Sequence, residues 1–187
     1  MLSVIIATDE SERALVPTLA ALVPGATAGA IREVIVADKG SRDQTAEVAD
    51  IAGCRLLVSP AALAGRLRAA AALARASWLM FLRPGIALDG SWIAETMRFI
   101  EAAELSSEPE RRAAAFSPGS GAYPAIAALR APWFRRPRPE QGLVVAKRLY
   151  DALGGHRDGV PHCESDLLRR LGRRRIAILR TAAIKVD

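Results

Sequence analysis

The sequence contains few of the residues that build metal centres, disulfide frameworks or base-stacking surfaces. Its 187 residues include two cysteines, two histidines and 5% aromatic residues. Cys54 and Cys163 lie far apart in the chain, which predicts two free thiols. Only His156 and His162 are available to complete a Cys/His zinc site, and no aromatic residue alternates with the basic clusters as in a stacking platform. We therefore expect no disulfide framework, no metal knuckle and no nucleic-acid partner.

Long apolar stretches are missing too. No run approaches the roughly 20 residues that a membrane-spanning helix needs. The N-terminus lacks the basic stretch of a signal peptide, and residues 2–7 are too short for its apolar core. These features predict a cytoplasmic protein without a transmembrane segment. The length fits one domain, 1–187, with a sizeable core, and 51% apolar with 25% charged residues is typical of a globular protein.

Glycine is missing where a dinucleotide-binding fold requires it. Residues 7–11, which follow the first expected strand, contain none, and the chain has no P-loop. This absence weakens the hypothesis of a dinucleotide-dependent oxidoreductase.

Positive charge is plentiful and comes from arginine. The net charge is +6, and 23 of the 26 basic residues are arginines, clustered at 135–138 and 169–175. A nucleic-acid patch is one explanation, and arginines that bind a diphosphate or an anionic acceptor are another, because the guanidinium binds phosphate bidentately. A solvated basic surface is the third explanation, and we assign most of these arginines to it.

The most informative stretch is Ile31 to Thr45. Val34 to Ala37 is a short β-branched run, typical of a strand buried on both faces of a parallel sheet. Asp38 follows at its carboxyl end, Gly40 and Ser41 supply a turn, and Asp43 stands at the N-cap position of the next helix. Ligands bind at the carboxyl ends of strands in open α/β sheets.

Strands and helices alternate along the first hundred residues. Strands are expected at 3–8, 34–37, 54–58 and 77–82. Helices are expected after Ser11 as N-cap as far as Pro24-Gly25, and at 44–49, 65–76 and 92–103. This order predicts an α/β fold with a doubly wound, mostly parallel sheet flanked by helices. Further along we expect a strand at 113–116, a long loop at 117–139 with a short helix near 125–129, a strand running into a helix at 143–153, a helix at 164–171 and a last strand at 175–179.

Residues 38–45, reading D-K-G-S-R-D-Q-T, resemble the D-x-G-S-x-D-x-T signature of family 2 glycosyltransferases, which have a GT-A fold. The strands at 3–8 and 78–82, the G-R-L-R-A segment at 65–69 and the helix at 164–171 resemble other segments of that family in the same order. The resemblance covers nearly the whole chain and is closest to a short, soluble bacterial subgroup. It implies a GT-A-like, Rossmann-like fold, with a nucleotide-binding half at 1–104 and an acceptor-side half at 105–187.

The resemblance also implies a substrate site. It assigns Thr8, Glu10, Asp38 and Arg66 to the nucleoside of a nucleotide-diphosphate sugar. The alternative for Asp38 is that its side chain caps the following turn, and for Asp43 the N-cap role is the better hypothesis.

The family holds Mg²⁺ or Mn²⁺ with a D-x-D or H-A-D motif directly after its fourth strand. The matching positions here read Arg83-Pro84-Gly85 and contain no carboxylate, so metal binding at that place is doubtful. Two hypotheses follow. Arg83, with Arg66 and Arg68, replaces the cation, or the site has lost its activity.

The family's general base is an aspartate at the start of a late helix. The matching carboxylate here is Glu164, with Asp166 two residues further on and Glu140 at another position where the subgroup has Asp. His156 and His162 are either acceptor-side residues or ordinary surface histidines. The leading hypothesis is a glycosyltransferase-like enzyme that transfers a sugar to an unknown acceptor with weak or no metal dependence. The alternative is a non-catalytic domain of the same fold that binds a nucleotide or a protein partner.

Overall fold

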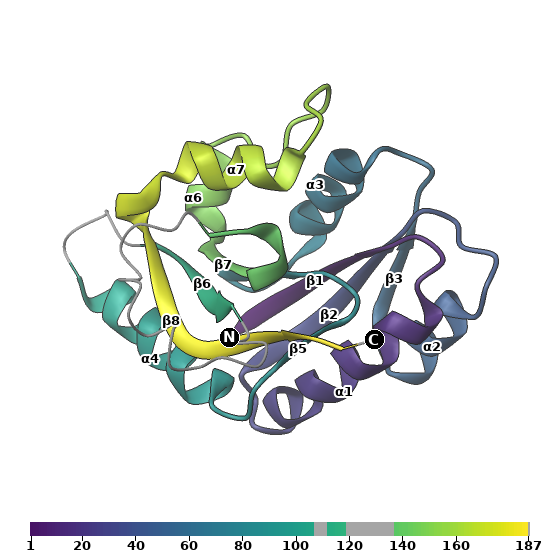
Figure 1. The fold of residues 1–187 in the computed structure, drawn as a ribbon, viewed down its shortest axis with the longest axis horizontal. Helices are drawn as coiled ribbons and strands as arrows, with labels where there is room; N and C mark the ends of the chain where they lie inside the picture. Colours follow the sequence, from purple (N-terminus) through teal and green to yellow (C-terminus); the bar gives the residue numbers. More distant parts are fainter. Residues whose placement is uncertain (107–111, 119–136, 187) are drawn as a thin grey trace.

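The computed structural model describes residues 1–106, 112–118 and 137–186, which form an α/β fold around a mixed sheet (Figure 1). The strands are β1 (Leu2–Thr8), β2 (Ile31–Asp38), β3 (Arg55–Val58), β4 (Trp78–Leu82), β5 (Ile86–Leu88), β6 (Ala113–Pro118), β7 (Leu143–Ala146) and β8 (Ile176–Lys185). The helices are α1 (Glu12–Thr27), α2 (Thr45–Ile51), α3 (Leu63–Leu73), α4 (Trp92–Leu105), α6 (Lys147–Ala152) and α7 (Cys163–Leu171), with 3₁₀ turns η2 (Pro139–Gln141) and η3 (Arg173–Arg175).

The eight strands lie in the order β3-β2-β1-β4-β7-β6-β8-β5. Strands β1 to β4 are parallel, as the alternation of strands and helices predicted. Strand β7 runs antiparallel to β4 and to β6, and β5 runs antiparallel to β8. The prediction of an α/β sheet flanked by helices is confirmed, and the antiparallel pairs make the sheet mixed.

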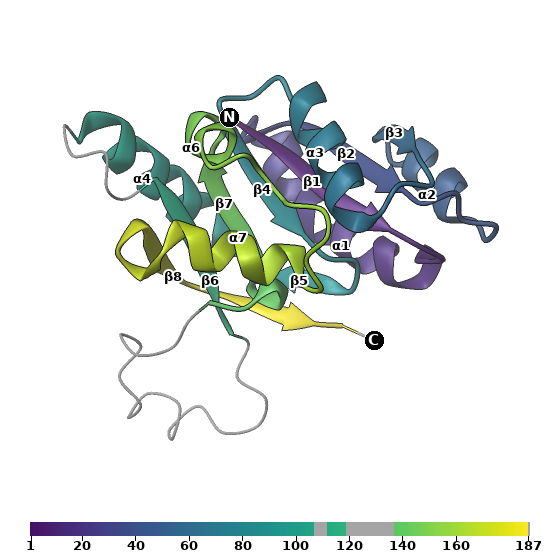
Figure 2. The same cartoon turned by 90° about the horizontal axis from the view of Figure 1, so that it is seen from above.

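Helices cover both faces of this sheet. Figure 1 shows α1, α2 and α4 on one side and α3, α6 and α7 on the other, and Figure 2 looks onto the side that carries α7. Successive residues of a strand point to opposite faces. In β4, Met80 accordingly packs in the core with α1 and α4, and Phe81 in the core with α3 and α7.

Helix α1 is longer than expected. It continues through Pro17 and Pro24, so the prediction that Pro24-Gly25 ends the helix is wrong. The amide of Ala28 donates to the Pro24 carbonyl at 2.9 Å, which carries the helix past the proline. A Cβ at Gly25 would lie 2.4 Å from the Trp92 ring, so glycine here permits the close packing of α1 against α4. Tertiary contacts override the helix-breaking signal.

Two further expectations were incomplete, and one falls outside the described residues. The short strand β5 was not expected, and β8 runs to Lys185 rather than ending at Leu179. The expected short helix at 125–129 and most of the loop at 117–139 lie in a part of the chain that the structure does not describe. Both cysteines are free thiols, as predicted. Among the described helices, none combines the length and the apolar character needed to span a bilayer.

Candidate functional site

The predicted site residues gather at the carboxyl edge of the parallel strands. Strand β1 lies between β2 and β4, with Thr8 opposite Asp38 and Ile6 opposite Leu82. Arg83 follows β4 directly, so it lies at the same edge of the sheet as Thr8 and Asp38. The strand order reverses direction at β1 and β4, and this is where an open α/β sheet forms its ligand crevice.

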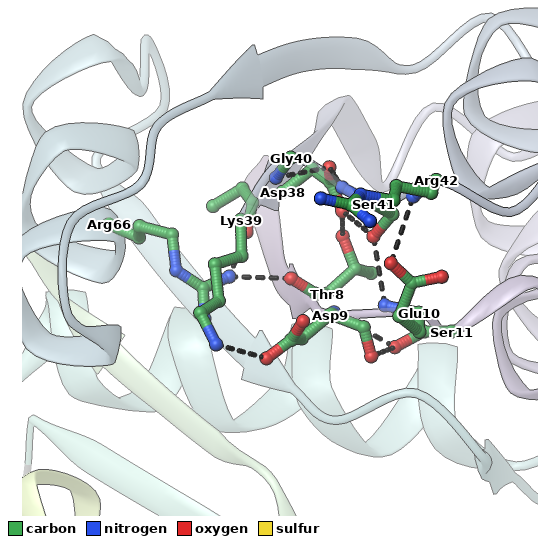
Figure 3. Close-up of polar contacts among 11 residues, drawn as sticks. Thr8, Asp9, Glu10, Ser11, Asp38, Lys39, Gly40, Ser41, Arg42 and Arg66 are labelled. Atoms are coloured by element: carbon green, nitrogen blue, oxygen red, sulfur yellow. Dashed lines mark hydrogen bonds and ion pairs between the residues drawn. The ribbon is translucent and has the colours of Figure 1, made fainter.

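The Asp38 carboxylate is buried, with 1% of the residue exposed, and four hydrogen bonds surround it. One oxygen accepts from the Thr8 hydroxyl at 2.7 Å and the Ser41 hydroxyl at 2.6 Å, and the other accepts from the Gly40 and Ser41 amides at 2.8 and 2.7 Å (Figure 3). Burial alone raises the pKa of Asp38, but these hydrogen bonds, led by that from the Ser41 hydroxyl, bring the pKa below its ordinary value. The turn-capping alternative therefore describes the side chain in this structure.

Glu10 holds the same two loops together from the other side. It has φ of 49°, the left-handed region that non-glycine residues rarely adopt. Its carboxylate accepts from the amides of Arg42 at 2.9 Å and Asp43 at 3.2 Å, while its own amide donates to the Ser41 hydroxyl at 2.9 Å. These three bonds between the β1–α1 and β2–α2 loops compensate for the unfavourable backbone angle.

Asp43 serves two helix starts at once. One carboxylate oxygen accepts from the Thr45 amide at 3.0 Å at the start of α2, although the N-cap position belongs to Gln44 and not, as predicted, to Asp43. The other oxygen accepts from the Glu12 amide at 3.0 Å at the start of α1, where Ser11 was the expected cap. Ser11 stands at the N-cap position of α1, as predicted, but its side chain makes no cap bond, and Asp43 supplies one instead. The hydrogen bond from the Thr45 hydroxyl is the main cause of a lowered pKa at Asp43.

Arg66 extends from α3 to the ends of β1 and β2. It is 5% exposed, and its Nη1 donates to the Thr8 carbonyl at 2.6 Å and the Ala37 carbonyl at 2.7 Å. Its Nε is a buried donor without a hydrogen-bond partner. Burial lowers the pKa of Arg66, and the charges of Asp9 and Asp38 act against this shift. Arg66 is thus a buried cation that joins α3 to the ends of β1 and β2.

A second polar cluster forms around Arg83. Its Nε lies 3.1 Å from each carboxylate oxygen of Glu164, its Nη2 contacts the same carboxylate, and its Nη1 donates to Glu140 at 2.8 Å. The hydrogen bond with Glu164 raises the pKa of Arg83 and outweighs the effect of burial. Segments 81 residues apart in sequence therefore meet as a forked ion pair.

Arg83 and Glu164 line a cavity of about 500 Å³. The other walls come from the start of α3 at 62–64, from Pro139 and Glu140, and from the loop that precedes α7 at 157–163. This volume lies in the range of small-molecule sites. The lining does not include Asp38 or Arg66, which lie at the same sheet edge but belong to the loop network beside β2.

Asp166 has a different environment from Glu164. Its oxygens accept from Arg169 at 2.5 Å and from Arg170 at 2.7 Å, and the bond from Arg170 is the main cause of its lowered pKa. Arg170 in turn donates to the carbonyls of Leu153 at 2.7 Å and Gly155 at 2.6 Å. These contacts attach α7 to the loop after α6, and they engage both oxygens of Asp166 in ion pairs.

Sequence reasoning missed a buried pair behind the cavity. His156 is 2% exposed, so the alternative of an ordinary surface histidine is wrong for it. Its Nδ1 lies 2.9 Å from the Tyr150 hydroxyl, and burial, aided by Arg170 and Arg68, lowers its pKa to about 4. Arg68 donates to the His156 carbonyl at 2.7 Å and pairs with Asp158. The adjacent Gly154-Gly155 turn was the only sequence signal of this packing.

The side chains at the position after β4 do not suit a divalent cation. Mg²⁺ is held by one or two carboxylates together with substrate phosphates. Here a guanidinium stands at that position and engages the two nearest carboxylates, Glu164 and Glu140. Asp89 accepts bonds from Ser91 and from the Ala182 amide at 2.8 Å instead. Among the described residues, no group of three His, Cys, Asp or Glu side chains is arranged to bind a metal.

Comparison with solved structures identifies the fold. S. aureus TarS residues 1–349 match with a TM-score of 0.72 and 16% identity, over 97% of this chain and 59% of TarS. Glucosyl-3-phosphoglycerate synthase from Mycobacterium tuberculosis matches with a TM-score of 0.68 and 18% identity, over 100% of this chain and 72% of the synthase. The mannosyltransferase PcManGT from Pyrobaculum calidifontis matches with a TM-score of 0.74 and 14% identity, over 95% of this chain and 55% of the enzyme.

These neighbours are glycosyltransferases with the GT-A fold, and the chain has that fold. It spans less than two thirds of the length of TarS and of the mannosyltransferase. No family model matches the sequence, and no curated protein matches it.

Proposed function

We propose that this chain is a glycosyltransferase-like protein that binds a nucleotide-diphosphate sugar and transfers the sugar to an acceptor, with Arg83 in place of a divalent cation. The observation that carries the proposal is the meeting of Arg83 and Glu164 on the wall of the 500 Å³ cavity at the carboxyl edge of the sheet. The solved neighbours support the substrate class, since the synthase binds UDP with Mn²⁺ and the mannosyltransferase binds GDP-Man with Mn²⁺.

Arg83 is the group that stabilises the departing diphosphate. A guanidinium supplies a fixed positive charge and paired donors that fit phosphate oxygens, and it acts more strongly in a partly desolvated cavity than in water. No step in this scheme passes through a metal ion. The carboxylates beside the position of the family's metal-binding motif, Glu164 and Glu140, are paired with Arg83.

Glu164 is the general base that accepts the proton of the acceptor hydroxyl. Without substrate its carboxylate is bound to Arg83, so the diphosphate must compete with Glu164 for the guanidinium. Donor binding then releases the base. Asp166, which was the other predicted catalytic residue, positions α7 through Arg170 in this scheme.

The nucleoside binds beside the β1–α1 and β2–α2 loops in residues 1–104. Thr8, Glu10 and Asp38 hold these loops in place, and Arg66 adds a buried positive charge behind them. The acceptor side is formed by residues 105–187, which supply α7 and Glu164.

A non-catalytic domain of the same fold is the second candidate. The observation that favours it is the tight engagement of Glu164 by Arg83, because a carboxylate paired with a guanidinium is not free to contact an acceptor hydroxyl. Such a domain binds a nucleotide or a protein partner and has no transferase activity.

Calorimetry with UDP-glucose and GDP-mannose, in EDTA and in Mn²⁺, tests the proposal. We expect binding of one donor in EDTA with little gain from Mn²⁺. Substitution Arg83→Gln should weaken binding about tenfold or more, because it removes a charge-assisted contact. The matched control is Arg148→Gln, at an exposed arginine on α6 outside the cavity lining. Donor binding that requires Mn²⁺ would contradict the role of Arg83.

Turnover separates the two candidates. A transferase hydrolyses its donor slowly in the absence of an acceptor, and Glu164→Gln should abolish this hydrolysis while nucleotide binding persists. Nucleotide binding with no hydrolysis in the wild-type protein indicates the non-catalytic domain. No binding of either donor leaves only the partner-binding form of the second candidate.

A further inference from the structure

A second cavity, of about 400 Å³, lies along α7, which contributes lining residues from Ser165 to Arg169. We propose that this cavity is an acceptor subsite for a small molecule that joins an apolar body to a phosphate or carboxylate. It shares Val160, Pro161, His162 and Ser165 with the 500 Å³ cavity, so the two spaces adjoin along one wall. The inference deepens the proposed function, on which the term acceptor rests.

The charge of the cavity selects an anion. Arg169 and Arg173 line it, and Asp166 is the one carboxylate in the described lining. Arg169 and Arg170 both pair with Asp166, so two guanidinium groups compensate its single negative charge. Arg173 lines the cavity as well. The described cluster is therefore positive, and an anionic group is the ligand that such a cluster attracts.

The Arg169 guanidinium is already oriented toward the cavity wall. Its Nη2 donates to Asp166 at 2.5 Å, and the side chain remains 70% exposed. A guanidinium carries five N–H donors, so one bond to a carboxylate leaves donors that can bind an oxyanion. Asp166 is held in turn by Arg170, which bonds the carbonyls of Leu153 and Gly155. This arrangement reduces the conformational entropy lost when an anion binds.

Most of the other lining residues are apolar, apart from His162 and Ser165. Val160, Leu168, Ile176 and two prolines, Pro137 and Pro161, form the walls beside the charged end. A space with apolar walls and a few convergent polar groups is the usual form of a small-molecule site. The volume fits a ligand of one or two rings, which argues for a small acceptor rather than a polymer.

The shared wall directs the acceptor toward the base. Glu164 lines the first cavity, Asp166 lines the second, and Ser165 between them lines both. An acceptor anchored by its anion at Arg169 extends its hydroxyl over Ser165 toward Glu164. There the hydroxyl oxygen bonds to the anomeric carbon, its proton passes to Glu164, and the nucleoside diphosphate leaves with the electrons of the broken bond.

Calorimetric titration with phenyl phosphate tests the inference, with benzyl alcohol and inorganic phosphate as probes of the two halves. We expect phenyl phosphate to bind more tightly than either fragment. Arg169→Gln should weaken phenyl phosphate about tenfold, because it removes a charge-assisted contact, and Arg169→Lys should lose less. The matched control is Arg174→Gln, at an exposed arginine of η3 outside the lining, which should bind as the wild type does.

The results that overturn the inference are equally specific. Equal weakening by Arg169→Gln and Arg174→Gln would mean a diffuse charge effect, and loss with Arg83→Gln alone would place the probe in the first cavity. Should Arg169→Gln fail to fold, as judged by circular dichroism, Arg173→Gln gives the same reading from a different element. Nucleotide titration of the wild-type protein, run in parallel, separates the two proposals. Nucleotide binding without phenyl phosphate binding ends the subsite, and the reverse result ends the proposed donor.

Discussion

Two groups of predicted substrate residues lie at the same edge of the sheet, and they differ in where their polar atoms are directed. Around Asp38 the carboxylate accepts four hydrogen bonds from the protein itself, and Glu10 bonds two loop amides. Around Arg83 the charged atoms pair with Glu164 and Glu140 on the wall of a 500 Å³ cavity. The first group shapes the edge of the site, and the second faces the space that a ligand can enter.

The difference predicts different phenotypes. Substitutions in the Asp38 group should change the free energy of unfolding, whereas substitutions in the Arg83 group should change nucleotide affinity. Both groups contain charged residues of the same resemblance-derived site, so the sequence pattern alone assigns them the same role. The following measurements examine the contrast.

The largest effect is expected for Asp38→Ala. The substitution leaves two loop amides and two hydroxyls without their acceptor, which should cost about 3 kcal/mol of unfolding free energy. Urea denaturation followed by circular dichroism measures this loss. The control is Asp9→Ala, whose exposed ion pair with Lys39 should contribute less than about 1 kcal/mol. Equal losses in the two variants would show that the Asp38 network is not structural.

Arg66→Met comes next. It keeps the apolar length of the side chain but removes the donor to the Thr8 and Ala37 carbonyls, so we expect a loss of about 2 kcal/mol. The control on the same helix is Arg68→Met, which breaks a partly exposed pair with Asp158 and one bond to the His156 carbonyl, and should cost about 1 kcal/mol. Thermal unfolding of the two variants compares them, and a larger loss for Arg68→Met would contradict the prediction.

Glu164→Gln should change nucleotide affinity rather than stability, and it should raise that affinity. It removes the charge that competes with the diphosphate for Arg83, so nucleotide binding should tighten about threefold to tenfold, or roughly 1 kcal/mol. Glu140→Gln should give a smaller gain, because Glu140 makes one bond and its side chain is 55% exposed. Weaker binding in Glu164→Gln would mean that Glu164 contacts the nucleotide directly.

The smallest expected effect is a loss of folding stability at acidic pH. The folded pKa of Asp38 lies below its unfolded value of about 3.9, because the hydrogen bonds outweigh the opposing effect of burial. The ionised carboxylate therefore adds stability that is fully present above that unfolded pKa and is lost as the pH falls through the folded pKa. Urea midpoints measured across this range should fall more steeply for the wild type than for Asp38→Asn. Parallel curves would exclude Asp38 as a source of acid sensitivity.

Much of the fold could be predicted from the chain, since its signals are local. The β-branched run before Asp38 and the alternation of strands with helices predicted β1 to β4 and the α/β fold. The antiparallel placement of β7 and the short strand β5 could not be predicted, because the partner of a strand depends on distant segments. The continuation of α1 through Pro24 depends on packing against Trp92, which no local pattern records.

The candidate site, too, was predicted only in part from the sequence. Arg83 and Glu164 were identified from their places in the family's order of motifs, but their ion pair joins residues 81 positions apart. The buried pair of His156 and Tyr150 had no sequence signal beyond the turn beside it.

The sequence by itself determined which side chains stand at the ends of the strands, because strand and turn propensities act over a few residues. Only the tertiary structure decided which of those side chains bond one another and which line a cavity. That outcome depends on burial and on hydrogen-bond partners contributed by distant segments. Asp38 became part of the framework because four donors fold around it, and Arg83 lines a cavity because α7 brings a carboxylate to its guanidinium.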